Sequence, residues 1–157
     1  MSGIRLARVR EASILAGFSR EHIETGLGWS WRPERLRRAI RDRETNVIVA
    51  EWDGATAGFA AMKYLDEHAH LMLFAVLPQW RRRGIGRDMW SWLADTATTA
   101  GLRRVNLEVR ARNTEARSFY RELGFTETET VRGYYRGVEA AVRMRLDIAE
   151  VIDSRLP

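Results

Sequence analysis

The chain has no cysteine among its 157 residues. It can therefore form no disulfide, bind no metal through a thiolate and use no cysteine as a nucleophile. Its longest apolar run, LMLFAVLP, is far too short to span a bilayer. The N-terminal segment scatters arginines and Glu11 among its apolar residues, which is not the pattern of a signal peptide. We therefore expect a soluble, cytoplasmic protein with no membrane partner.

Lysine is nearly absent, because Lys63 is the only one. The 26 basic and 21 acidic side chains leave a formal charge of +5, and nearly all of the positive charge is arginine. This balance favours an anionic partner, such as nucleic acid, a membrane or a phosphorylated cofactor, without choosing among them. With 45% hydrophobic residues, the length suits one compact core, so we expect a single domain over residues 1–157.

Proline is also scarce, and no internal repeat, low-complexity tract or linker interrupts the chain. Apolar periodicity and turn residues predict the order β-α-α-β-β-β-α-β-α-β-β, a mixed-sheet α/β domain. The expected helices are 11–28, one within 29–40 whose first position suits Pro33, 86–100, and one that Asn113 caps and Gly124 closes. The expected strands are 4–9, 46–52 and 56–65 joined as a hairpin, 68–78, 104–111, and two within 125–148.

The stretch QWRRRGIGRDMW, residues 79–90, puts three consecutive arginines and Gly84-x-Gly86 at the entrance of a predicted helix. A helix N-terminus offers unpaired amides and a positive dipole, and glycine lets a ligand approach the backbone closely. The stretch therefore predicts a pyrophosphate cradle. A glycine turn with solvated arginines explains an isolated motif of this kind equally well.

A second motif in LEVRARNTEARSFYRELGF has the form N-x-x-A-x-x-x-Y, through Asn113, Ala116 and Tyr120. With the R-x-x-G-x-G of the arginine stretch, in this order, it resembles the GNAT superfamily of N-acetyltransferases. The match covers roughly residues 46–146, and NLEVRARN and RGYYRGVEAAVRMRL are most similar to the ribosomal-protein N-terminal alanine acetyltransferases. The chain departs from that group in a shorter connection after its Tyr-Tyr pair and in the Trp-rich GWSWRPE.

The resemblance implies a single GNAT-like α/β domain whose mixed, mostly antiparallel sheet is flanked by helices and splays between its fourth and fifth strands. It also implies acetyl-CoA as cosubstrate, with no metal. The residues implied to bind acetyl-CoA are Phe74, Ala75, Val76, Arg81, Arg82, Arg83, Gly84, Ile85, Gly86, Arg87, Asn113, Ala116 and Tyr120.

By the same resemblance, Tyr120 is the catalytic acid that protonates the leaving thiolate. A phenol with a pKa of about 10 is a plausible donor to a thiolate whose conjugate acid lies at about 8.5, although a tyrosine on an apolar helix face also suits a core. Glu108, a carboxylate in mid-strand, is the candidate base, acting through water; an ion pair with a neighbouring arginine explains it equally well. His70 is the alternative base, although a lone histidine is more often structural.

The amine acceptor is implied to be a peptide or protein N-terminus, with Trp29, Trp31, Tyr134 and Tyr135 lining its pocket or simply packing. The alternatives are a small-molecule amine, or a catalytically silent acyl-CoA sensor. A nucleic-acid-binding module is a third alternative, but the charge is spread through the chain and no standard DNA-reading motif appears. A monomer and a homodimer both fit the resemblance.

Overall fold

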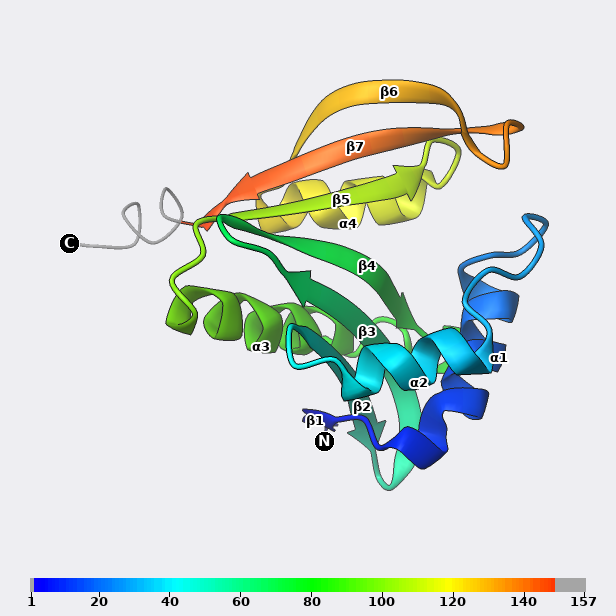
Figure 1. Ribbon diagram of the computed structural model, residues 1–157, viewed down its shortest axis with the longest axis vertical. Helices are drawn as coiled ribbons and strands as arrows, with labels where there is room; N and C mark the ends of the chain where they lie inside the picture. The colour runs from blue at the N-terminus through cyan, green and yellow to red at the C-terminus, as the bar shows by residue number, and fades with distance from the viewer. Residues whose placement is uncertain (1, 149–157) are drawn as a thin grey trace. The chain divides into compact units, whose positions relative to one another are not determined.

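The computed structural model describes residues 2–148 (Figure 1). Its strands are β1 Ser2–Leu6, β2 Thr45–Trp52, β3 Ala55–Tyr64, β4 His68–Val76, β5 Arg104–Arg110, β6 Thr126–Tyr135 and β7 Glu139–Asp147. Its helices are α1 Ala12–His22, α2 Pro33–Arg41, α3 Ile85–Thr99 and α4 Thr114–Leu123, with short 3-10 turns η1 Val9–Glu11 and η2 Pro78–Trp80. The predicted order of helices and strands is confirmed.

The hydrogen-bonded order of the seven strands is β1-β2-β3-β4-β5-β7-β6. The β4–β5 pair is parallel, whereas β1–β2, β2–β3, β5–β7 and β6–β7 are antiparallel. The expected mixed, mostly antiparallel sheet with flanking helices is thus confirmed. No helix in the described part of the chain is long and apolar enough to cross a membrane.

The chain divides into two compact units, residues 2–64 with 72–96 and residues 65–71 with 97–148. β4 and α3 each contribute to both. The expectation of a single domain over residues 1–157, and that of a splay between β4 and β5, stay predictions.

The first unit is built on the β2–β3 hairpin. Asp53 and Gly54 both have positive φ, of 51° and 81°, which is the turn geometry that joins two right-twisted strands most tightly. On one face of the sheet, Phe59 packs with Leu15 of α1 and Leu36 of α2, and all three are fully buried. Figure 1 shows these two helices in front of the hairpin.

The other face of the hairpin is buried as deeply, and glycine permits a close contact there. A Cβ on Gly58 would lie 2.8 Å from the carbonyl oxygen of Ala75 and 2.9 Å from the sulfur of Met89. Those atoms belong to the end of β4 and the first turns of α3. Because real Cβ atoms do not approach so closely, only glycine allows β3, β4 and α3 to pack as they do.

The prediction of a helix over 11–28 was too long, because α1 ends at His22. The amides of Ile23 and Glu24 both donate to the carbonyl of Ser19, which closes the helix. Gly26 and Gly28 then take φ of 81° and turn the chain away from the helix axis. The first strand also ends earlier than expected, at Leu6, because Val9 begins η1.

The second unit pairs the start of β4 with β5 and continues through β7 to β6. His70 lies opposite Asn106 in the parallel pair, and Glu108 lies opposite Arg143 in the antiparallel one. The predicted alternation of β5 is confirmed, since Val105, Leu107 and Val109 are its buried residues. α4 begins at its predicted cap, Asn113, and ends at Gly124 with φ of 107°.

Candidate functional site

The arginine-glycine loop leads into the N-terminus of α3. Arg82 and Gly84 have φ of 65° and 80°, and nothing lies within 4 Å of the place where a Cβ on Gly84 would sit. The amide of Asp88 donates to the carbonyl of Gly84 at 3.1 Å, so the helical hydrogen bonds start there. The amides of Ile85 and Gly86 come before this bond and lack an acceptor within the helix. The backbone thus presents donors beside open space, as a bound anion requires.

Two arginines of this loop hold the loop itself. Arg81 Nε donates to the carbonyl of Val76, the last residue of β4, at 3.1 Å. The guanidinium of Arg83 lies 5.3 Å from the ring centre of Trp52 and 5.2 Å from that of Trp80. Both contacts are within the range of cation–π attraction. The side chains of Arg81 and Arg83 therefore fix the loop, and its backbone is left to receive a ligand.

The strand that precedes the loop alternates in burial. Ala75 is buried, whereas Phe74 and Val76 on either side of it are partly exposed. The predicted cofactor residues 74–76 and 81–87 thus belong to one continuous stretch of the first unit, which runs from the end of β4 through η2 into α3.

In the second unit, Glu108 of β5 and His70 of β4 meet side by side. His70 Nε2 lies 2.6 Å from Glu108 Oε2, and Arg143 Nε of β7 lies 3.6 Å from Oε1. The hydrogen bond from His70, with help from the charge of Arg143, holds the pKa of the Glu108 carboxyl below its usual value against the effect of burial. Glu129 of β6 pairs in turn with Arg143. Glu108 is thus an ionised carboxylate shared by an imidazole and a guanidinium.

Tyr120 lies in α4 and is 7% exposed. Its ring makes edge contacts with Phe119 and Phe125, at centroid distances of 5.6 and 5.7 Å. Burial, and next the charge of Tyr135, raise the pKa of Tyr120, so its hydroxyl stays protonated throughout the physiological range. The protonation state is the one that a proton donor needs.

Of the other predicted residues in this unit, Asn113 lies at the start of α4, and Tyr134 and Tyr135 lie at the end of β6. Asn113 Oδ1 accepts the amide of Ala116 at 3.1 Å, so the predicted helix cap is confirmed. At the end of β6, the rings of Tyr134 and Tyr135 meet edge to face at 5.0 Å. Burial raises the pKa of both tyrosines, and the charge of Glu108 adds to that effect.

A buried carboxylate organises the Trp-rich segment of the first unit. Glu24 Oε1 accepts the amide and the hydroxyl of Ser30, at 2.8 and 2.6 Å, and the amide of Trp31 at 3.3 Å. Its Oε2 accepts the hydroxyl of Ser19 at 2.9 Å. Glu24 is only 8% exposed, and these contacts tie the end of α1 to the chain that enters α2. We call residues 24–31 the stapled segment.

The two tryptophans of the stapled segment have different environments. Trp31 is 8% exposed and belongs to the core, with the guanidinium of Arg35 3.8 Å above its ring. Trp29 is partly exposed, and its Nε1 donates to the carbonyl of Ala16 at 3.1 Å. It borders a surface pocket of about 450 Å³. The other residues that line this pocket are Arg20, Glu21, Glu24, Thr25, Gly26 and Gly28.

The structure therefore brings Glu108 and His70 together and joins the cofactor residues of the first unit into one stretch. Sequence reasoning missed Glu24, which no motif marks, and it assigned Trp52 and Trp80 only to packing. The sequence offered only a weak signal for Glu24, namely an acidic residue two positions before the first of the two glycines Gly26 and Gly28. No group of three or more metal-binding side chains lies close together within residues 2–148.

Comparison with known proteins supports one family. Residues 13–125 match the model of the acetyltransferase (GNAT) family. The [ribosomal protein bS18]-alanine N-acetyltransferase of Escherichia coli (strain K12) is 37% identical over 132 residues, which cover 82% of this chain and 88% of that protein.

Two solved structures have the same fold. The crystal structure of the ribosomal-protein-S18-alanine N-acetyltransferase from Escherichia coli superposes with a TM-score of 0.81 at 27% identity, over 94% of each chain. The PaiA N-acetyltransferase from Thermoplasma acidophilum, solved in complex with coenzyme A, gives a TM-score of 0.79 at 19% identity, over 94% of this chain and 99% of that one.

We expect Glu24→Ala to loosen the stapled segment, because the change removes the acceptor of the buried Ser19 hydroxyl and Trp31 amide, and also that of the Ser30 donors. The free energy of unfolding should fall by about 3 kcal/mol in urea titrations. The amides of Ser30 and Trp31 should also exchange their hydrogens faster. Glu21→Ala is the matched control, since that side chain is 72% exposed and its change should cost less than about 0.5 kcal/mol. Equal stability of the two variants would contradict the role of Glu24.

Proposed function

Because the chain belongs to the acetyltransferase (GNAT) family and is an N-acetyltransferase that uses acetyl-CoA, we propose that its acceptor is the N-terminal α-amine of a peptide or protein. The observation that carries this proposal is the 37% identity, over 82% of the chain, to an enzyme that acetylates an alanine of a ribosomal protein. An α-amine has a pKa of about 8, so a modest shift of proton equilibrium supplies its reactive neutral form, whereas a lysine at about 10.4 demands more. We also propose that the protein works in the cytoplasm.

The residues of the arginine-glycine loop suit acetyl-CoA. The open space above Gly84 and the first-turn amides of α3 are features of a pyrophosphate seat. We assign to this seat the backbone of residues 82–87, and to the amide-rich pantetheine arm the strand residues 74–76. When bound, acetyl-CoA supplies a thioester whose thiol is the leaving group. Because the loop is already held by Arg81 and Arg83, little ordering is needed when it binds.

The reaction joins the amine nitrogen to the acetyl carbon and breaks the bond from that carbon to sulfur. The amine loses one proton and the leaving thiolate gains one. We propose that the Glu108–His70 pair receives the amine's proton, directly or through a water. The 2.6 Å contact supports a shared role, because the lowered pKa of Glu108 makes it a weak base by itself but a good partner for a charged imidazole.

We propose that Tyr120 donates the proton that the thiolate takes up. The contacts of its ring with Phe119 and Phe125 fix the position of the side chain, and the hydroxyl is protonated at physiological pH, as a donor must be. Asn113, the cap of this helix about two turns before Tyr120, and Ala116, one turn before it, are assigned to the neighbouring part of the cofactor. We assign Trp29, Trp31, Tyr134 and Tyr135 to the acceptor side of the site. Because Trp31 is buried, its role there is to support Trp29 and the segment around it rather than to contact the acceptor.

Replacing Gly84 with alanine should weaken acetyl-CoA binding about tenfold, because a Cβ at a φ of 80° costs about 1–2 kcal/mol and shifts the loop. Calorimetric titration with acetyl-CoA measures the change. Gly101→Ala is a matched control, because Gly101 has φ of 83° and equally open surroundings but lies after α3. A control that loses as much affinity as Gly84→Ala would mean that the loop is not the cofactor seat.

Tyr120→Phe should lower kcat by about 10²–10³ and leave the Kd for acetyl-CoA nearly unchanged, because only the transferable proton is removed. Tyr64→Phe, which loses a hydroxyl that contacts Asn46, is the control and should keep full turnover. Glu108→Gln and His70→Gln should each depress kcat, and the double variant should be no worse than the more damaging single one, as for two groups that act together. Unchanged turnover in Tyr120→Phe would remove it from the mechanism.

The acceptor class is tested by comparing kcat/KM for an alanine-initiated peptide, the same peptide with a blocked N-terminus, a polyamine and an aminoglycoside. We expect turnover of the free peptide alone. Preference for either small amine would replace the peptide proposal with a small-molecule acetyltransferase. Acetyl-CoA binding without transfer to any of them would indicate a silent acyl-CoA sensor.

A further inference from the structure

One short segment is rich in arginine. Residues 32–43, RPERLRRAIRDR, contain six arginines against Glu34 and Asp42, a net charge of +4. Other stretches are basic as well, such as residues 81–87 with four arginines and no acidic residue. Residues 32–43 comprise α2 and the residues that flank it, and we call them the arginine segment.

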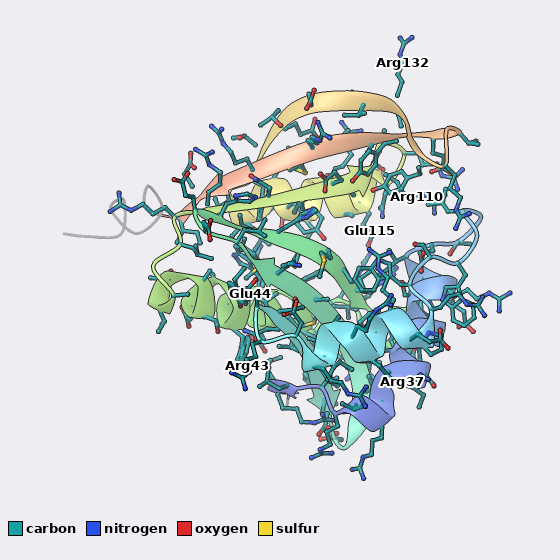
Figure 2. All side chains as sticks on the ribbon, in the orientation of Figure 1. Arg37, Arg43, Glu44, Arg110, Glu115 and Arg132 are labelled. Carbon is teal, nitrogen blue, oxygen red and sulfur yellow. The ribbon has the colours of Figure 1, made fainter. Side chains whose placement is uncertain are left out.

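The arginines of the arginine segment form no close ion pairs in the described part of the chain, although the charge of Glu24 acts on Arg35. In the second unit, Arg110 pairs with Glu139, Arg117 with Glu127, and Arg143 with Glu129. Within residues 2–148, none of the arginines of the arginine segment makes a salt bridge with an acidic side chain. Arg37, labelled on α2 in Figure 2, differs from its neighbours, because its Nη1 is buried without a hydrogen-bond partner in the described structure, so the accessible charge comes from the exposed arginines such as Arg38 and Arg41. The segment therefore carries positive charge that is available to a partner.

The helix places these charges on one side. Leu36 and Ala39 are buried against the sheet, and Arg38 and Arg41 lie on the opposite, exposed side. From Arg35 to Arg41 the helix rises about 9 Å. An extended peptide covers the same length with about three residues, at about 3.3 Å each. A short acidic run in a polypeptide thus matches the spacing of the exposed arginines.

The arginine segment adjoins the stapled segment that the proposed function assigns to the acceptor. The guanidinium of Arg32 lies 4.7 Å from the ring centre of Trp29, and Arg35 lies over Trp31. We propose that the arginine segment is a docking surface for acidic side chains that follow the N-terminal residue of the acceptor. The enzyme then selects peptides with aspartate or glutamate within about six residues of the amine. This inference rests on the proposed function.

The same observations speak against a nucleic-acid partner. Single-stranded nucleic acid binds by stacking bases on open aromatic faces beside cationic grooves. Here Trp31 is buried under Arg35, and Trp29 already has Arg32 at 4.7 Å and Arg20 at 5.1 Å from its ring centre. Glu34 in the first turn of α2 and Asp42 just after its end also interrupt the positive charge. Carboxylates, which a guanidinium binds in a bidentate manner, fit this surface better.

The test uses the full-length protein and three peptides with the same first two residues, alanine first, and with Glu, Ser or Arg at positions three to six. At low salt, kcat/KM for the Glu peptide should exceed that for the Arg peptide about tenfold, and the ratio should shrink as salt rises. In the double variant Arg38→Glu/Arg41→Glu the preference should reverse. Both positions are exposed, so the variant should fold.

The control variant is Arg103→Glu/Arg132→Glu, which changes the net charge equally at two exposed arginines of the second unit. Figure 2 shows Arg132 extending from β6 away from the ribbon. This variant should keep the wild-type preference. Reversal in the control as well would reduce the effect to overall charge and overturn the docking surface.

The remaining outcomes separate the two proposals. Equal acetylation of all three peptides by wild type would refute the docking surface and leave the N-terminal acetyltransferase intact. Acetylation of none would refute the proposed function, and the docking surface with it. An RNA oligonucleotide that binds wild type but not Arg38→Glu/Arg41→Glu, with no preference among the peptides, would replace the acidic peptide with nucleic acid.

Discussion

The missing side chain at Gly58 is the constraint on which the geometry of the first unit depends. It lets β3 approach the backbone of Ala75, near the end of β4, and the thioether of Met89 more closely than any other residue would allow. Met89 lies in the first turns of α3, so this contact sets where that helix begins. The helix start carries the amides and the left-handed turn at Gly84. The proposed cofactor seat is therefore positioned by packing on the sheet as well as by the side chains of Arg81 and Arg83 in its own loop.

Backbone and side chains have separate tasks around that seat. The side chains of Arg81 and Arg83 are bound to a carbonyl and to two indole rings, and the amides face open space. The stapled segment follows the same principle, because one carboxylate holds two serines and the backbone of Trp31. In both places internal contacts set the shape of the chain before any ligand arrives, which lowers the entropy cost of binding.

Local chemistry allowed much of the fold to be predicted. The Asp-Gly turn, the cap at Asn113, Pro33 at the start of α2 and the alternation of β5 each depend on residues within a few positions of one another. The overlong helix at 11–28 shows the limit, since its end is set by Glu24 bonding to residues six and seven positions further on. The contact of His70 with Glu108 bridges 38 positions, and no spacing rule reveals it. The GNAT resemblance supplied the candidate roles, and the tertiary structure supplied their neighbours.

The prevalence of arginine over lysine has a consequence for an enzyme whose cosubstrate is a thioester that amines attack. A guanidinium keeps its proton at any physiological pH and is no nucleophile toward a thioester, whereas an ammonium group deprotonates more readily. The cationic surface around α2 therefore offers the acetyl donor nothing to react with. The one lysine, Lys63, has its Nζ 4.0 Å from a carboxylate oxygen of Asp42. The arginine side chains can therefore keep their positive charge in the presence of acetyl-CoA, and the protein has few side-chain amines that it could acetylate on itself.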